Sequence, residues 1–334
     1  MSEIRQDPTT REWVIIARER AKRPQDFVHG QSKPELPSFS PSCPFCPGNE
    51  AMTPPESFTM LDKSSKKWRI RVFPNHFPAL TPEGSTERRE HDGFFLDMDG
   101  KGIHEVIVET PQHNAPLALA DESRLVDILL TYQKRYIALS ETPFLKLIII
   151  FKNNGPSAGT SLEHPHSQLV ATPVIPRHIR IRHEIAVRYY DDTGRSLYSD
   201  LVNHELQAGE RIVINTDKFA VFHPFASHSP FETWIVPRTY QASFCNVSSE
   251  DIRKLARVLR ITLLKLFRGL NNPDYNFIID TAPMGDENKD YYLWHMRIIP
   301  RLTEVAGFEI GTGIDINTAL PEETAQFMRE FKAE

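Results

Sequence analysis

Cysteine is scarce in this sequence, and it has no basic blocks or long apolar runs. Only three cysteines occur among 334 residues, an odd number that argues against a framework of paired disulfides. No apolar run approaches the roughly 18 residues that a membrane span needs, and the N-terminus lacks the apolar segment typical of secretion. The formal net charge is −5, without the basic face that nucleic-acid binding requires. We therefore predict a cytoplasmic protein whose partners are neither membranes nor nucleic acids.

The composition that remains is that of an ordinary globular protein. Hydrophobic residues make up 40% of the chain and charged residues 25%, which supplies enough apolar side chains for a core. A chain of this length forms one large domain or two of ordinary size. A small anionic substrate is compatible with the net charge, because a few local arginines are enough to hold one.

The chain alternates predicted strands with two long amphipathic helices. One helix covers residues 121–140, and the other opens at Ser249, which we expect to be its N-cap. Each helix lies between groups of strands. The predicted strands cover residues 69–73, 103–109, 146–151 and 168–172 in the first half, and 211–215, 219–223, 232–236, 276–280 and 293–299 in the second.

This repeated order predicts an internal duplication. Residues 104–108 are similar to 231–235, and residues 163–166 are similar to 294–297, with an offset of about 130 residues in both pairs. The second pair matches Arg297 with His166. We therefore predict an α+β fold of two similar halves related by a pseudo-twofold axis, covering residues 1–175 and 176–334.

A pair of cysteines in a proline-rich segment indicates a metal site. Cys43 and Cys46 are two residues apart, so both thiolates can reach one tetrahedral Zn²⁺, which needs two further ligands. His113 and His164 are the best candidates, since His113 lies just after a predicted strand and His164 starts the densest histidine cluster in the chain. A Cys₂His₂ site of this kind would fasten the long N-terminal loop to the first half. The alternative interpretation of the two cysteines is a redox pair.

A loop of small residues follows the strand that ends at Phe151. In residues 155–161, which include Gly159, Thr160 and Ser161, small side chains let backbone N–H groups and hydroxyls approach phosphate oxygens closely. This stretch therefore predicts a phosphate-binding loop.

The segment His164-Pro165-His166-Ser167-Gln168 follows this loop and carries the candidate catalytic groups. Alternate side chains of an extended strand share one face, so His164, His166 and Gln168 should point the same way. An unprotonated imidazole suits attack on phosphorus, and the bond that it forms is labile enough to pass the group on. We assign His166 as the nucleophile and Gln168 as a donor to an oxygen whose charge grows in the transition state.

Together these residues resemble the galactose-1-phosphate uridylyltransferase family of the histidine-triad superfamily, over nearly the whole chain. Residues 20–24 resemble a basic segment that contacts nucleotide, residues 72–80 resemble the uridine pocket, and residues 151–155 with Ser161 resemble the phosphate loop. The resemblance implies two histidine-triad-like halves, each an antiparallel sheet with helices. It implies catalytic roles for His166, Gln168 and Ser161. The expected substrate-binding residues are Arg20, Arg23, Asn75, Asn153, Gly159 and Thr160.

The same resemblance implies an activity. His166 would attack the α-phosphorus of UDP-glucose, release glucose 1-phosphate and carry the uridylyl group until a hexose 1-phosphate takes it, as in galactose metabolism. The Zn²⁺ would be structural. A homodimer would build each active site from both chains.

Departures from the family pattern concern the acceptor. Ser167 replaces a glycine, and the segment 311–317 lacks an aromatic–glutamate pair that the best-known branch uses near the hexose. Asp280, His295 and Arg297 offer at most one histidine where some members hold a second metal, so we expect none. These features resemble nucleotide-sugar phosphorylases of the ADP-glucose type, in which inorganic phosphate replaces the sugar 1-phosphate as acceptor. That activity is the alternative expectation, and a nucleotide-conjugate hydrolase is a third.

Overall fold

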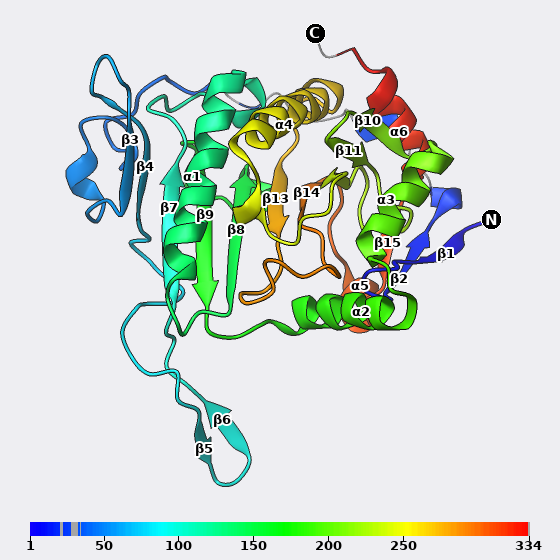
Figure 1. The fold of residues 1–334 in the computed structure, drawn as a ribbon. Coiled ribbons are helices and arrows are strands. Elements are labelled where there is room, and N and C mark those ends of the chain that lie inside the picture. Colours follow the sequence, from blue (N-terminus) through cyan, green and yellow to red (C-terminus); the bar gives the residue numbers. More distant parts are fainter. Residues whose placement is uncertain (21–22, 28–32, 34, 333–334) are drawn as a thin grey trace.

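One antiparallel sheet of ten strands runs through both halves of the computed structural model, which describes residues 1–20, 23–27, 33 and 35–332 (Figure 1). The predicted α+β class with antiparallel sheets is confirmed. In order across the sheet, the strands are β10 (Ile212–Asn215), β11 (Phe219–Phe222), β12 (Thr233–Pro237), β14 (His295–Pro300), β13 (Tyr275–Asp280), β8 (Leu147–Asn154), β9 (His166–Thr172), β7 (Ile103–Val108), β4 (Trp68–Pro74) and β3 (Phe58–Leu61).

The order of the strands shows the duplication. Outward from the central pair β13 and β8 come β14 and β9, then β12 and β7, then β11 and β4. Each half follows the same chain order, with strands before and after one long helix. The two halves meet through backbone hydrogen bonds between β13 and β8, so the sheet is continuous across them. A domain boundary at residue 175 stays a prediction.

Two long helices pack side by side on one face of this sheet (Figure 1). Helix α1 (Glu122–Ser140) begins after Asp121, whose carboxylate accepts from the Arg124 N–H. Helix α4 (Ser249–Gly269) begins after Ser248, whose hydroxyl accepts from the Asp251 N–H. The N-cap expected at Ser249 was therefore wrong by one residue, because Ser248 has the extended backbone that a cap requires.

The helices also show which residues of the two halves correspond. Their buried positions match in sequence order: Leu125 with Ile252, Leu129 with Ala256, Tyr132 with Leu259 and Tyr136 with Leu263. The same spacing matches Phe151 with Ile278, which pair directly across β8 and β13. Gln168 pairs with Phe151, and Arg297 pairs with Ile278. Arg297 therefore corresponds to Gln168, and His295 to His166, which shifts the match made from the sequence by two residues.

The other face of the sheet is covered differently in the two halves. In the C-terminal half it is covered by α2 (Arg177–Thr193) and α3 (Leu197–Ala208), from which Tyr198 and Val202 pack on Phe222 and Trp234. The sequence analysis assigned no helix there, since α2 buries little of its surface. In the N-terminal half the same face carries the loop with Cys43, packed on Phe73, Val106 and Val108.

Smaller elements complete the C-terminal half. A three-stranded sheet joins β1 (Glu3–Gln6), β2 (Trp13–Ile16) and β15 (Asp315–Asn317). Along the chain, α5 (Gly307–Thr312) precedes β15 and α6 (Pro321–Glu330) follows it, and α6 packs on β10. The hairpin β5 (Arg89–His91) and β6 (Phe95–Asp97) projects away from the rest of the molecule (Figure 1). Among the residues that the structure describes, no helix is long and apolar enough to cross a membrane.

Candidate active site and metal centre

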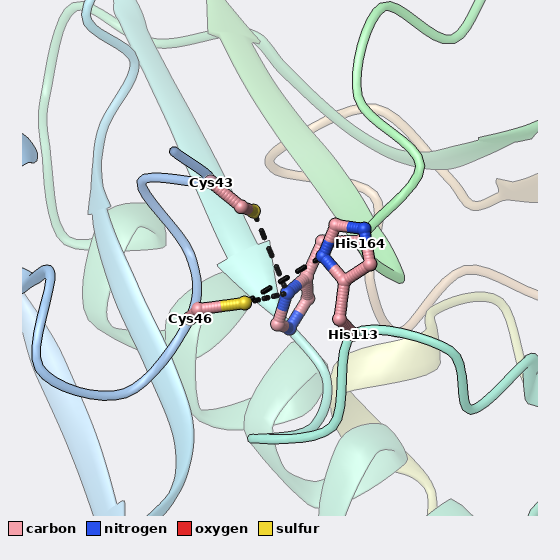
Figure 2. Close-up of side chains that lie close together, drawn as sticks. All are labelled: Cys43, Cys46, His113 and His164. Carbon is pink, nitrogen blue, oxygen red and sulfur yellow. Dashed lines mark hydrogen bonds between the residues drawn. The ribbon is translucent and has the colours of Figure 1, made fainter. Parts of the chain in front are cut away.

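Four predicted metal ligands come together beside β9 (Figure 2). The ligand atoms of Cys43, Cys46, His113 and His164 all lie within 4.8 Å of one another, and all four residues are buried. The His164 Nδ1 atom is 3.7 Å from the Cys43 sulfur and 3.6 Å from the Cys46 sulfur. His164 Nε2 donates to the Thr110 carbonyl at 2.8 Å, which directs the unprotonated Nδ1 at the sulfurs. This donor set can hold one metal ion.

His166 is the first residue of β9 and carries the candidate nucleophile. Its Nδ1 lies 2.9 Å from the His164 carbonyl, so Nδ1–H donates and Nε2 is left with a free lone pair. Burial lowers the pKa of His166 below its usual value, so the imidazole is unprotonated at neutral pH. The ring is held edge-on by Phe45, with centroids 5.3 Å apart. The arrangement presents an unprotonated nitrogen in a fixed orientation.

Gln168, two residues along the same strand, is oriented by a residue that the sequence analysis did not assign. His104 Nδ1 accepts from the Ala79 N–H at 3.1 Å, so its proton is on Nε2. That Nε2–H donates to Gln168 Oε1 at 2.8 Å, and Asn75 Nδ2 is 3.1 Å from the same nitrogen. The amide N–H groups of Gln168 are thereby available to an oxyanion. Alternate side chains of a strand lie on the same face, so His104 and Val106 share one face of β7. This alternation could have identified His104 from the sequence.

The predicted phosphate loop is braced by the C-terminal half. Asp274 accepts from the Ser157 N–H at 2.7 Å, and a Cβ on Gly155, where φ is 91°, would lie 1.9 Å from its carboxylate. Asn276 donates to Asn153 Oδ1 at 2.8 Å and to the Ala158 carbonyl at 2.9 Å. The loop therefore tolerates only glycine at its first position.

The remaining loop residues lie at the end of this turn. Gly159 and Ser161 are exposed, and Gly159 has a φ of 86°. Thr160 is half-buried and its hydroxyl donates to the Leu162 carbonyl at 3.1 Å. The structure thus leaves the backbone and hydroxyl groups of this turn near the surface.

A buried polar network lies under the strand of the nucleophile. Lys152 Nζ donates to the His166 carbonyl at 2.9 Å and to Glu109 at 2.8 Å. Ser167 also donates to Glu109, and the Tyr132 hydroxyl is 2.6 Å from that of Ser167. Burial disfavours a charged carboxylate, but the Lys152 ammonium holds the pKa of Glu109 below its usual value. The network fixes the peptide of His166 from the face opposite its imidazole.

The sequence analysis recognised Ser167 only as a departure from the family pattern. Lys152 and Glu109 are each nearly inaccessible, with side-chain exposures of 1% and 0%. In the sequence they are ordinary charged residues on strands, 43 positions apart. No local pattern could have indicated that they form a pair.

The basic segment is found beside the C-terminal half. Phe27 packs on Phe231 with ring centroids 5.8 Å apart, and Arg23, four residues earlier, is exposed. Strand β12, which begins just after Phe231, is about 19 Å from β9 at about 4.8 Å per strand. The side chain of Arg20 lies outside the part of the chain that the structure describes. The structure does not bring Arg23 together with His166 within the residues described.

Comparison with known families decides the identity. Residues 1–176 match the N-terminal domain of galactose-1-phosphate uridyl transferase, and residues 182–334 match its C-terminal domain. The chain belongs to the galactose-1-phosphate uridyl transferase family. The predicted resemblance is therefore confirmed, and with it the assignment as a nucleotidyl-transferring enzyme.

Relatives of two kinds match nearly the whole of this chain. ADP-glucose phosphorylase of Arabidopsis thaliana is 36% identical over 98% of this chain and 92% of its own. Galactose-1-phosphate uridylyltransferase of Thermotoga maritima is 28% identical over 100% of both. The solved structure of the Arabidopsis phosphorylase with bound ADP-glucose matches with a TM-score of 0.84 and 33% identity, covering 99% of this chain and 100% of that chain. A uridylyltransferase structure matches with a TM-score of 0.76 and 27% identity, covering 98% and 97%.

The buried network under the nucleophile predicts the effect of Lys152→Met. The variant leaves Glu109 buried without a counter-charge, which costs about 3–5 kcal/mol of stability in comparable cases. The variant also removes the donor to the His166 carbonyl, so the orientation of the candidate nucleophile is no longer fixed. We therefore expect kcat to fall by about tenfold or more at nearly unchanged KM. Steady-state kinetics on the folded fraction, with Tm alongside, measures both effects.

The matched control for this variant is Arg135→Met. Arg135 donates two hydrogen bonds to Glu105, at 2.8 and 2.9 Å, and this pair joins α1 to β7. Unlike Lys152, Arg135 donates no hydrogen bond to the peptide of His166. We expect it to lose stability and keep kcat. An equal loss of kcat in both variants would show that the Lys152 network is merely structural.

Proposed function

We propose that this enzyme is a nucleotide-sugar phosphorylase that transfers the nucleotidyl group of a donor such as ADP-glucose to inorganic phosphate. The observation that carries the proposal is the likeness to ADP-glucose phosphorylase, at 36% identity and a TM-score of 0.84, against 28% and 0.76 for uridylyltransferases. The sequence analysis put the uridylyltransferase first and the phosphorylase second. The comparisons favour the second.

The geometry of His166 supports a two-step reaction. Its Nε2 attacks the α-phosphorus of the donor, an N–P bond forms, and the bond to the β-phosphate oxygen breaks to release glucose 1-phosphate. The Nδ1–H bond to the His164 carbonyl holds the ring as it gains charge. An oxygen of inorganic phosphate then attacks the same phosphorus, the N–P bond breaks, and ADP leaves with His166 restored.

The surrounding groups suit the oxyanion that forms. Gln168 has its Oε1 occupied by His104, so its amide N–H groups are those that meet a non-bridging oxygen. We assign the phosphate oxygens of the donor to Asn153 and to the turn at Gly159, Thr160 and Ser161. Asn75 lies beside His104 at the edge of the same site, where it would contact the nucleoside.

We further propose that the Cys₂His₂ cluster holds Zn²⁺. Two thiolates and two imidazoles in a buried, closed set are the ligands of a structural zinc. The ion would fix His164, and through the carbonyl of that residue the ring of His166. A reduced, cytoplasmic location agrees with the free cysteines of the described chain.

The metal assignment predicts one zinc per chain. Cys43→Ser should lower zinc content and Tm together, because structural zinc contributes roughly 10 kcal/mol or more to folding. Cys245→Ser is the matched control, since Cys245 is a free thiol outside the cluster, and it should keep the full zinc content. Elemental analysis that finds no zinc in the purified wild-type enzyme would refute the assignment.

We also propose a homodimer in which Arg20 and Arg23 reach the nucleotide of the partner subunit. The support is the position of the segment at Phe27, which packs on the C-terminal half, several strands away from His166. Mixing inactive Arg23→Ala with inactive His166→Ala should then restore part of the activity, since hybrid dimers hold one intact site. Each variant alone is the control. Absence of recovery despite demonstrated subunit exchange would contradict shared sites.

The choice of acceptor separates the phosphorylase from its alternatives. We expect labelled ADP-glucose to give a nucleotidyl adduct on wild-type enzyme and none on His166→Ala, as measured by intact-protein mass spectrometry. Inorganic phosphate should release the adduct as ADP faster than galactose 1-phosphate or glucose 1-phosphate releases it. Release by galactose 1-phosphate alone would identify a hexose-1-phosphate nucleotidyltransferase, and rapid release by water alone would identify a hydrolase.

A further inference from the structure

A cavity of about 260 Å³ lies in the C-terminal half, away from His166. It is enclosed by helix α2, strand β14 and the turn between β1 and β2. Its lining includes Thr10, Glu12, His178, Arg182, His228 and Arg297. Nothing in the proposed reaction uses this cavity.

The cavity is lined by guanidinium groups that share one carboxylate. Arg182 is 6% exposed, and its Nε and Nη1 atoms are buried without a hydrogen-bond partner in the described part of the chain. Its nearest counter-charge is Asp280, 3.5 Å away. The same carboxylate accepts from Arg297 Nε at 2.5 Å. Because Arg182 and Arg297 share this one carboxylate, Arg182 keeps donors without a hydrogen-bond partner in the described part of the chain, which a bound anion would satisfy.

The remaining charges near the cavity are centred on His228, which contacts Asp7 and Asp315 and lies close to Glu232. Burial works against a charged imidazole, but hydrogen bonds with Asp315 and Asp7 raise the pKa of His228 to about 10, so it is a cation at neutral pH. The carboxylates of Asp7, Asp280, Asp315 and Glu232 are not part of the lining. Glu12 is the one carboxylate among the described residues that line the cavity, and it is exposed.

The correspondence between the halves relates residues at this cavity to residues of the candidate active site. Arg297 corresponds to Gln168, and by the same pairing Asp280 and His295 stand where Asn153 and His166 stand in the first half. His295 is fully buried and stacked on Trp234, with centroids 4.4 Å apart, so it cannot reach a ligand. In the second half, therefore, a cationic donor (Arg297) replaces Gln168, a carboxylate (Asp280) replaces Asn153, and the histidine that corresponds to His166 is buried.

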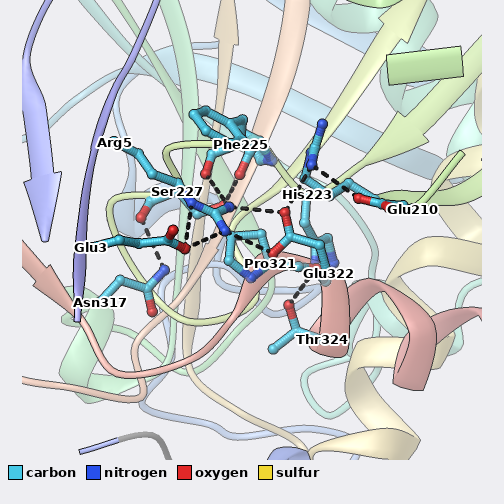
Figure 3. A network of polar contacts seen from close by, with 12 residues as sticks. Glu3, Arg5, Glu210, His223, Phe225, Ser227, Asn317, Pro321, Glu322 and Thr324 are labelled. Carbon is cyan, nitrogen blue, oxygen red and sulfur yellow. Dashed lines mark hydrogen bonds and ion pairs between the residues drawn. The ribbon is translucent and has the colours of Figure 1, made fainter. Parts of the chain in front are cut away.

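The wall that carries Thr10 and Glu12 is held in place independently of any ligand. Arg5, on β1, binds Glu322 of α6 at 2.9 Å and the Phe225 carbonyl at 2.8 Å (Figure 3). Asn317, on β15, donates to the Ser227 carbonyl at 2.9 Å, next to His228 (Figure 3). The cavity is thus preformed, and a ligand would enter it at little cost in ordering the protein.

We propose that this cavity is a second anion site, which binds the phosphate group of inorganic phosphate or of a small phosphomonoester without transforming it. Arg182 and Arg297 supply the charge-assisted hydrogen bonds, with Thr10 and His178 at the entrance. The site is independent of the nucleotidyl chemistry at His166. Its ligand is bound and released unchanged.

Equilibrium dialysis with labelled inorganic phosphate tests the proposal. Arg182→Met and Arg297→Met should weaken the binding to this site by about tenfold or more, because each removes charged hydrogen bonds. Arg135→Met, which removes a half-buried arginine of the other half, is the matched control and should bind as wild type does. Any phosphate bound at the nucleotide site binds equally to wild type and to all of these variants. It therefore does not contribute to the difference in binding between them. Equal binding by wild type and both cavity variants would overturn the proposal.

A second variant decides the matter if the arginine variants fail to fold. Glu12 is exposed, so Glu12→Gln cannot disturb the core, and removal of its charge should tighten phosphate binding several-fold. Unchanged or weaker binding would contradict the site. Crystals soaked in tungstate give the location: an anomalous peak between Arg182 and Arg297 supports the proposal, and a peak at His166 alone refutes it.

Discussion

The hydrogen bond from His166 Nδ1 to the His164 carbonyl is the contact on which the proposed active site depends. It decides which ring nitrogen is free, and it ties the proposed nucleophile to a residue whose own side chain belongs to the Cys₂His₂ cluster. A displacement of His164 would therefore move the carbonyl and the ring together. The long N-terminal loop affects the chemistry by this route, since it supplies Cys43 and Cys46.

A second set of contacts, in addition to the one with the His164 carbonyl, fixes the peptide of His166. Lys152 binds its carbonyl, and Glu109 holds both Lys152 and Ser167. A buried ion pair is weak evidence for stability, because desolvation offsets much of the attraction. Its position under the nucleophile suggests that it is retained for geometry. The same reasoning explains why serine follows His166 here, since its hydroxyl completes the network.

The two halves share one architecture and have taken different roles. The first keeps the imidazole of His166 at the start of β9, with 7% of the residue exposed. The second buries His295 against Trp234 and places Arg297 with Asp280 in the corresponding positions. The second half also serves the first directly, because Asp274 and Asn276 brace the loop that begins at Gly155. The active site therefore needs both halves even though its reacting groups come from one.

The sequence by itself determined the features that repeat at short range. Spacing along the chain was enough to predict both long helices, most strands, the duplication and the sets Cys43, Cys46, His113, His164 and His166, Gln168. Periodicity and residue chemistry are local, so these predictions needed no contacts. The tertiary structure decided what depends on partners far apart in sequence: the orientation of Gln168 by His104, the pairing of Lys152 with Glu109, and the match of His295 with His166. Strand register and burial determine these contacts, and neither can be predicted from one segment of the chain alone.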